Sequence, residues 1–350
     1  MGQSVTFTGP RRVDIAAIED PPLGPREVRV ETLYSGISAG TELTGYRGSN
    51  PYLNKRWDEE RRLFVETDAT SLSYPIEGWG YEEGGRVVEV GSEVTEVTEG
   101  DVVYGTWGHR SHVVLPVERA SAKLPEGVDP KCSIFSRIGA IALNGVVDAD
   151  IHVGEYVAIF GQGVPGLIAT QLARLNGATV IAVDAIGSRL ELAGRLGASH
   201  LVDVTKEDAG EAIKALTGGR GADVSIEISG VYGALHSAIR STAYNSRVVA
   251  CGFFQGDGRG LYLGEEFHHN RIDVMCSQIS GVRADLSHRW DVKRLERTVM
   301  ELQAQGRIDL GALISHVFPY ERAADAFRLL DEDSASAVQV VLDFTEERER

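Results

Sequence analysis

The sequence predicts an α/β protein in which a compact β domain precedes a doubly wound parallel sheet. Short strand signals broken by turn residues fill the first third of the chain, and apolar strand signals then alternate with helical ones. A chain of 350 residues is also too long for one ordinary core. We expect a β domain over 1–125, an α/β domain over 126–285, and a segment over 286–350 that returns to the first domain.

The first region alternates apolar and polar residues between Gly- and Pro-rich turns, which predicts a barrel-like β domain. Its expected strands lie at 5–7, 12–15, 27–31, 85–90, 101–105 and 111–115. Residues 50–72 differ, because they are charged, contain Pro51 and lack clear periodicity. We interpret them as a long loop, whose basic residues either line a substrate pocket or form a solvated face; the nearby acids favour the second reading.

The second region begins with an apolar stretch of helical spacing over 130–147, which predicts a linking helix. Continuous apolar strands separated by helices follow, the pattern of a parallel sheet covered on both faces. The expected strands are 156–160, 179–183, 201–204, 224–228, 247–251 and 273–277, and the expected helices 164–176, 188–196 and 208–217. The tail is predicted to hold helices over 292–305 and 320–330 and a strand over 338–342.

Charge and composition exclude several classes of function. The net charge of −16 argues against binding to nucleic acid or to an anionic membrane surface. We find no run of about 18 apolar residues and no export signal, so we expect no membrane span and a cytoplasmic location. Cys132, Cys251 and Cys276 are widely spaced, which favours buried reduced thiols.

A glycine-rich turn follows the predicted strand 156–160 and opens a helix: Gly161-Gln162-Gly163-Val164-Pro165-Gly166. In this motif the first glycine permits the tight turn, the second lets a pyrophosphate approach the backbone, and the third allows close packing of helix and strand. The helix N-terminus offers free amides to the phosphates. The strand, turn and helix together predict a dinucleotide site; the alternative is a turn without a nucleotide.

Asp184 ends the second strand of this region, 21 residues after Gly163. An acid there hydrogen-bonds the adenosine ribose and repels a 2′-phosphate, so we expect NAD rather than NADP. Arg189 lies close enough in sequence to serve as an alternative partner for the ribose or its phosphate.

Several segments together resemble the medium-chain dehydrogenase/reductase superfamily over nearly the whole chain. The matching segments are 22–30 (PLGPREVRV), 35–42 (SGISAGTE), 80–91 (GYEEGGRVVEVG), 153–155 (VGE) and 320–327 (YERAADAF). The resemblance implies a GroES-like β-barrel-type domain, a Rossmann domain, a cleft between them, and a homodimer or homotetramer that acts on a small molecule. The segment 35–42 is similar to a subgroup that contains many sugar- and natural-product-tailoring oxidoreductases.

The chain departs from the zinc-dependent members of this superfamily at each ligand position. Ser38 stands at the place of the Cys ligand, Tyr81 at that of the His, and Arg137 at that of the acid or Cys in the linking helix, although Glu82 remains. Zinc prefers thiolate, imidazole and carboxylate donors, which a guanidinium cannot replace. We therefore expect no metal, neither a catalytic nor a structural zinc.

Other side chains must then stabilise the developing oxyanion. Tyr81 is expected to donate a hydrogen bond or a proton, with Arg137 lowering its pKa or steadying the oxyanion. Glu82, Ser38, Thr41 and Glu42 are candidates for a relay. Asn144 is a candidate contact for the nicotinamide ribose, and Trp107, His109 and Glu42 for the substrate. Each of these also has a structural reading, as a packing residue, an ion pair or a helix cap. His268 and His269 have no third ligand in view and are expected at the surface.

These features together predict hydride transfer between NAD(H) and a secondary alcohol or ketone, with a polar sugar-, cyclitol- or natural-product-like substrate. Two alternatives stay open. One is a zinc-free quinone or enone reductase, and the other is a non-catalytic NAD-binding protein.

Overall fold

The computed structural model describes residues 2–19 and 21–345, and it divides into two compact units. Unit 1 comprises Met1–Arg137 and Ile314–Arg350, and unit 2 comprises Ile138–Leu313. The division falls near the start of the linking helix and again just before a C-terminal strand, whereas the sequence placed it at 125/126 and 285/286. The predicted α/β class, with a parallel sheet in one unit and separate sheets in the other, is confirmed.

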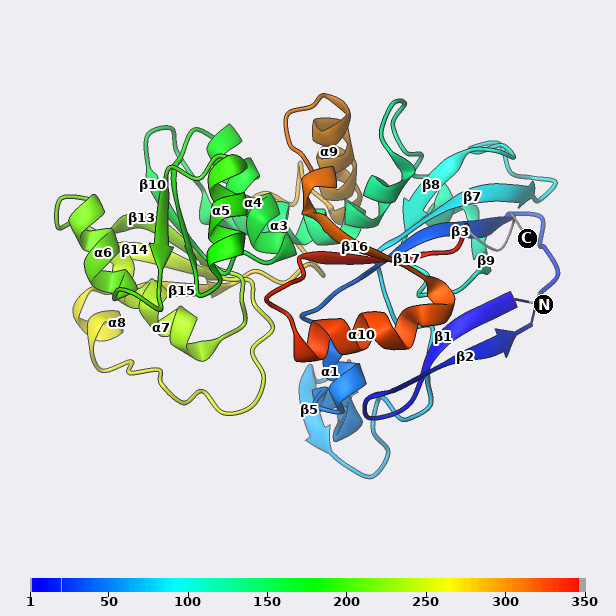
Figure 1. The fold of residues 1–350 in the computed structure, drawn as a ribbon, viewed down its shortest axis with the longest axis horizontal. Helices are drawn as coiled ribbons and strands as arrows, with labels where there is room; N and C mark the ends of the chain where they lie inside the picture. The colour runs from blue at the N-terminus through cyan, green and yellow to red at the C-terminus, as the bar shows by residue number, and fades with distance from the viewer. Residues whose placement is uncertain (1, 20, 346–350) are drawn as a thin grey trace. The chain divides into compact units, whose positions relative to one another are not determined.

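Unit 2 is built on a six-stranded parallel sheet with the order β12-β11-β10-β13-β14-β15 (Figure 1). The chain builds the sheet outward from β10 to β12 on one side and then from β13 to β15 on the other, so the strand order reverses between β10 and β13. In doubly wound nucleotide-binding folds, ligands bind beyond the carboxyl ends of the strands at such a reversal. The strands are β10 (Tyr156–Phe160), β11 (Thr179–Asp184), β12 (His200–Asp203), β13 (Ala222–Glu227), β14 (Thr242–Ala250) and β15 (Asp273–Cys276).

Helices lie on both sides of this sheet in Figure 1. Side chains of α6 and α7 pack into one core with Ala158, Phe160 and Ile181 of the strands. The sequence analysis did not identify α7, which follows the turn at Gly230. The helices of unit 2 are α4 (Val164–Leu175), α5 (Gly187–Arg195), α6 (Ala209–Leu216), α7 (Tyr232–Ser241), α8 (Glu266–His269), α9 (Val292–Ala304) and the short 3₁₀ helix η3 (Gly311–Leu313).

The strands of unit 1 form two larger sheets and one hairpin. One sheet has the order β2-β1-β6, and the other runs β16-β17-β3-β7-β8 with β9 also paired to β3. The strands are β1 (Gly2–Gly9), β2 (Arg12–Ile18), β3 (Glu27–Ile37), β4 (Lys55–Asp58), β5 (Leu63–Glu66), β6 (Ile76–Glu77), β7 (Glu83–Val90), β8 (Val102–Gly105), β9 (His112–Pro116), β16 (Ile314–Pro319) and β17 (Gln339–Asp343).

The C-terminal segment belongs to unit 1 because β17 pairs antiparallel with β3, Val340 opposite Ile37. The strand β3 is long enough to pair with β17 and β7 and also with β9. The helices of this unit are α1 (Glu42–Arg47), η1 (Pro51–Leu53), α2 (Val117–Ala120), η2 (Pro130–Ile134), η4 (Tyr320–Arg322) and α10 (Ala323–Glu332).

The segment 50–72 is not the loop that the sequence predicted, because it contains the hairpin β4–β5. Trp57 lies opposite Phe64 with ring centroids 5.0 Å apart, and such cross-strand aromatic pairs stabilise a hairpin even where the sequence lacks alternation. Its basic residues form surface ion pairs, among them Arg61 with Asp58 at 2.9 Å, which agrees with a solvated face.

The helix α3 (Phe135–Ala149) follows η2 and corresponds to the predicted linking helix. Together the two make a stretch, Pro130–Ala149, that is long and apolar enough to cross a membrane by length and composition alone. In the structure, 83% of the most apolar 18-residue part of this stretch is buried, as in the core helix of a globular domain.

A cluster of aromatic rings fills one core of unit 1. Phe327 of α10 contacts Phe7 of β1 edge to face, with centroids 4.9 Å apart, and stacks on Tyr46 of α1 at 5.6 Å. His109 meets the same ring edge to face at 5.9 Å. Phe327 therefore joins the C-terminal segment to both the first strand and the loop that carries His109.

We expect Phe327→Ala to destabilise unit 1 by about 3–5 kcal/mol, because it removes a fully buried ring and leaves a cavity. Urea unfolding followed by tryptophan fluorescence measures this, since Trp57, Trp79 and Trp107 lie in unit 1. Val317→Ala, on the exposed side of β16, is the control and should change the unfolding free energy by less than about 0.5 kcal/mol. Equal effects of the two substitutions would contradict this account of the core.

Candidate functional site

The predicted glycine turn lies between β10 and α4 of unit 2. Gly161 has a φ of +96°, which a residue with a side chain rarely adopts. A Cβ added at Gly166 would lie 1.8 Å from the carbonyl oxygen of Gly161, so only glycine fits there. The turn is therefore packed against the first residues of α4, as the motif requires.

Gly163 is different, because a Cβ there would meet no protein atom within 4 Å. Gly163 is the N-cap of α4, its φ is an ordinary −72°, and no side chain caps the first amides of the helix. Val164 and Pro165 follow as the first helical residues. The turn thus leaves open space beside uncapped amides at the positive end of a helix, a favourable place for a phosphate group.

Asp184 ends β11 next to this turn. Its Oδ2 accepts a hydrogen bond from the Gln162 amide at 2.5 Å, and its Oδ1 accepts one from the Ile186 amide at 2.8 Å. Burial lowers the pKa of the nearby Arg189, and the charge of Asp184 opposes that shift. The structure therefore brings Gly161, Asp184 and Arg189 together, at the end of the sheet where ligands bind.

Glu227 at the end of β13 is a buried acid that the sequence analysis did not single out. Its carboxylate accepts hydrogen bonds from the Ser229 amide at 2.9 Å and the Gly230 amide at 3.2 Å. Burial raises the pKa of Glu227 to about 7, although these donors oppose the shift. The signal was an acid within the apolar run 224–228, because a buried strand seldom contains a charge without a partner.

Asn144 of α3 lies at the end of β15. Its Nδ2 donates to Ser277 Oγ at 3.1 Å and, at 3.4 Å, to both the Gly281 carbonyl and Asp148 Oδ2. The Oδ1 atom of Asn144 is buried without a hydrogen-bond partner among the described residues. Asn144 is thus fixed by one side of its amide, and the other side is available to an incoming donor.

In unit 1, the structure brings Ser38, Thr41 and Tyr81 together. Ser38 follows β3, Thr41 caps α1, and Tyr81 precedes β7. The Tyr81 hydroxyl shares a short hydrogen bond with Ser38 Oγ. Burial and the charge of Glu82 raise the pKa of Tyr81 above its usual value, while the hydroxyls of Ser38 and Thr41 oppose the shift.

This direction contradicts the expectation that a cation lowers the pKa of Tyr81. The neighbouring acids Glu82 and Glu42 both raise the pKa of the phenol. Arg137 is half-buried near the start of α3. The raised pKa therefore favours the protonated phenol near neutral pH.

Glu42 and His109 form a buried pair in unit 1. Glu42 Oε2 lies 2.5 Å from His109 Nε2, and Ser35 Oγ lies 2.6 Å from the other ring nitrogen. Both members of the pair are fully buried. Burial alone would lower the pKa of His109, but the charge and hydrogen bond of Glu42 raise it. The other oxygen of Glu42 accepts the Ser38 amide at 2.9 Å, so the pair is linked to the residue that bonds Tyr81.

Glu83 completes this network and was not identified from the sequence. It accepts the Trp107 amide at 2.6 Å and the Ser35 hydroxyl at 3.2 Å. Burial raises the pKa of Glu83 to about 7, and the charge of His109 opposes the shift. Glu42, Trp107 and His109, the predicted substrate contacts, are buried and hydrogen-bonded within unit 1.

Glu82 is buried beside this network, and neither carboxylate oxygen has a hydrogen-bond partner among the described residues. Burial and the neighbouring charges of Glu42 and Glu83 raise its pKa well above the usual value. The side-chain amide of Gln339 lies near Glu82 and opposes this rise in the pKa of Glu82. The hydrogen bonds of that amide go to the carbonyls of Ile37 and Val340. Burial therefore disfavours the charged form of the Glu82 side chain.

Comparison with known proteins identifies the family. Residues 165–292 match the family model described as zinc-binding dehydrogenase. D-guloside 3-dehydrogenase from Shigella flexneri is 31% identical over 351 residues, which cover 98% of this chain and 100% of the relative.

Solved structures with the same fold include a putative zinc-binding dehydrogenase from Sinorhizobium meliloti bound to NADP. It has a TM-score of 0.79 at 24% identity and covers 98% of this chain and 99% of its own. An alcohol dehydrogenase from Escherichia coli CFT073, complexed with NADH, has a TM-score of 0.77 at 22% identity with the same coverage. The chain is an oxidoreductase of the dehydrogenase type, and it belongs to the zinc-binding dehydrogenase family of medium-chain, alcohol dehydrogenase-like proteins.

Proposed function

We propose that the chain is an NAD(H)-dependent dehydrogenase that interconverts a secondary alcohol and a ketone of a sugar-like substrate without catalytic zinc. The observation that carries the proposal is the glycine turn, where Gly163 leaves open space beside the uncapped amides of α4. Gly161, Gly163 and the first amides of α4 would hold a nicotinamide dinucleotide, which would supply the acceptor or donor for a hydride at the substrate's carbinol carbon. Relatives and fold neighbours that are named dehydrogenases, some bound to NADP or NADH, support this assignment.

Asp184 supports NAD over NADP. Its carboxylate lies at the end of β11 and already accepts two backbone amides, so it is held in place as a negative charge beside the turn. A second negative group, the 2′-phosphate of NADP, would be repelled there. Arg189 is close to Asp184 and is the residue that would weaken this preference.

The residues at the family's zinc position do not suit zinc. A serine hydroxyl and a phenol whose pKa is raised are poor donors compared with thiolate and imidazole. Among the described residues, the one group of three His, Cys, Asp or Glu side chains with metal-ligand spacing is elsewhere, in unit 2. We therefore derive no catalytic step through a metal.

Tyr81 and Ser38 take the place of the metal in this proposal. Because the phenol of Tyr81 is neutral, it donates a hydrogen bond to the substrate oxygen, where negative charge develops during hydride transfer. When a ketone is reduced, that oxygen takes up a proton from the Tyr81–Ser38 pair, which regains one from solvent; when an alcohol is oxidised, its hydroxyl proton passes through the pair to solvent. Ser38 holds the phenol through its own hydroxyl.

The pair of Glu42 and His109 acts through Ser38 as a positioning element. Glu42 accepts the Ser38 amide, and His109 fixes Glu42 from the opposite side. Because both are fully buried, they set the direction of the Ser38 hydroxyl without contacting substrate themselves. Thr41, at the N-cap position of α1, belongs to the same positioning element because its hydroxyl interacts with Tyr81 and lowers the pKa of the phenol.

The substrate class follows from the relatives' names and the polar groups of the site. A D-guloside 3-dehydrogenase acts on a sugar derivative, and a (R,R)-butanediol dehydrogenase of Bacillus subtilis, 28% identical over 297 residues, on a diol. A sugar derivative and a butanediol of this kind both carry secondary hydroxyl groups. We propose a glycoside or a related polyol as the substrate.

An absorbance assay tests this function. We expect reduction of NAD⁺ with at least one compound of a panel of glycosides, polyols and amino sugars, and no oxidation of NADH by enones. The rate should be unchanged after EDTA treatment and desalting, because no step uses zinc. Activity on enones alone would favour the reductase alternative, and loss of activity that returns with zinc would refute the metal-free site.

Gly163→Ala tests the nucleotide site without disturbing the fold. The added methyl group meets no protein atom, but it occupies the space beside the helix amides, so NADH affinity should fall at least about tenfold with unchanged thermal stability. Fluorescence titration with NADH and NADPH measures both affinity and the expected preference for NADH. Gly166→Ala is the contrast, because its methyl group would strike the Gly161 carbonyl and destabilise unit 2 by about 1–3 kcal/mol or more. Unchanged NADH binding by Gly163→Ala would contradict the proposed site.

Tyr81→Phe tests the hydrogen-bond donor. We expect the single-turnover rate of hydride transfer to fall about 100-fold or more, because the phenyl ring keeps the packing and removes the donor. NADH affinity should be unchanged. Tyr244→Phe, an exposed tyrosine of unit 2, is the control. A Tyr81→Phe rate equal to that of the unaltered protein would eliminate the role.

A further inference from the structure

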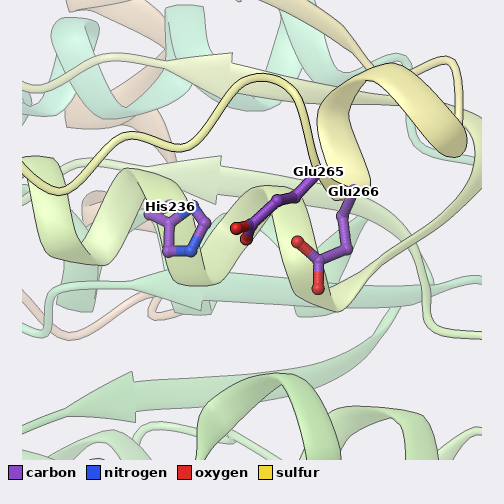
Figure 2. Close-up of side chains that lie close together, drawn as sticks. All are labelled: His236, Glu265 and Glu266. Atoms are coloured by element: carbon purple, nitrogen blue, oxygen red, sulfur yellow. The ribbon is translucent and has the colours of Figure 1, made fainter.

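A histidine and two glutamates of unit 2 converge away from the glycine turn (Figure 2). His236 comes from the middle of α7, and Glu265 and Glu266 come from the start of α8. Their ligand atoms all lie within 4.8 Å of one another. Figure 2 shows the side chains projecting into the same space from these two elements.

Two atoms of this cluster are buried and lack a hydrogen-bond partner among the described residues: His236 Nδ1 and Glu266 Oε2. A buried polar atom without a partner costs free energy, so a group that satisfies both atoms would stabilise the fold. Arg240 pairs with the other oxygen of Glu266, Oε1, at 3.3 Å and with Asp208 at 2.6 Å. That guanidinium therefore does not satisfy Oε2.

We infer that His236, Glu265 and Glu266 bind a divalent transition-metal cation, with Zn²⁺ as the best match. One imidazole and two carboxylates are donors that zinc accepts, and three protein ligands with a water complete its tetrahedral geometry. Glu265 is exposed, which leaves room for that water. The cation would satisfy the two partnerless atoms and would be bound by the carboxylates of Glu265 and Glu266, the second of which also pairs with Arg240.

The site would join α7 to the segment that follows β14. Residues 251–265 are mostly irregular and run from the end of β14 to α8, with Phe253 and Tyr262 exposed along them. The ring of Tyr262 packs edge to face on His236, with centroids 5.3 Å apart, so this segment already contacts the helix at the proposed site. A cation that closes this loop would hold the segment against α7 and stabilise unit 2.

Calorimetric titration of ZnCl₂ into EDTA-treated, desalted protein tests the inference. We expect one equivalent of Zn²⁺ per chain with micromolar or tighter affinity, and a rise in the midpoint of thermal unfolding. His236→Gln and Glu265→Gln should each weaken binding at least tenfold and abolish the thermal shift. His288→Gln, an exposed histidine outside the cluster, is the matched control and should bind as the unaltered protein does.

Two results would overturn the inference: no Zn²⁺ binding by the unaltered protein, or equal binding by His236→Gln and His288→Gln. These results leave the proposed enzyme function unaffected, because NADH titration and the substrate panel are measured separately. If one equivalent of zinc remains in His236→Gln and is required for activity, the metal-free catalytic site is wrong instead.

Discussion

The pairing of Glu42 with His109 is the interaction on which the architecture of unit 1 depends. Three carboxylates, those of Glu42, Glu82 and Glu83, are fully buried within a short distance of one another. A buried carboxylate is costly unless a cation or hydrogen bonds compensate it. His109 pairs with Glu42, the Ser38 amide donates to Glu42, and the Ser35 hydroxyl and the Trp107 amide donate to Glu83. In this way the end of β3, the start of α1 and the loop before β9 are held in one arrangement.

That network also explains why the phenol of Tyr81 is a donor rather than a base. The neighbouring acids Glu82 and Glu42 raise the pKa of the phenol. Burial then favours the neutral phenol over the phenolate. In the proposed function, a site built in this way would stabilise negative charge on a bound oxygen through hydrogen bonds, the role that a metal ion plays in zinc-dependent dehydrogenases.

Much of this could be predicted from the sequence because the relevant signals are local. The glycine turn, the apolar strands on either side and Asp184 are close in sequence. The turn needs glycine because Gly161 has a positive φ and because a Cβ at Gly166 would strike the Gly161 carbonyl. The linking helix followed from its spacing of apolar residues. The hairpin at 50–72 was missed, since its strands are held by a cross-strand contact between Trp57 and Phe64 that leaves no periodic pattern.

The sequence by itself determined the order of the parallel sheet's elements and the glycine turn, and it predicted that Ser38, Tyr81 and Arg137 stand at the family's metal-ligand positions. Only the tertiary structure decided how those residues behave. It buried His109 against Glu42, which are 67 residues apart, and it set the direction of the Tyr81 pKa shift. It also brought His236 to Glu265. The physical reason is that burial and the distance between charges depend on contacts across the chain, whereas a turn or an apolar strand depends on its own residues.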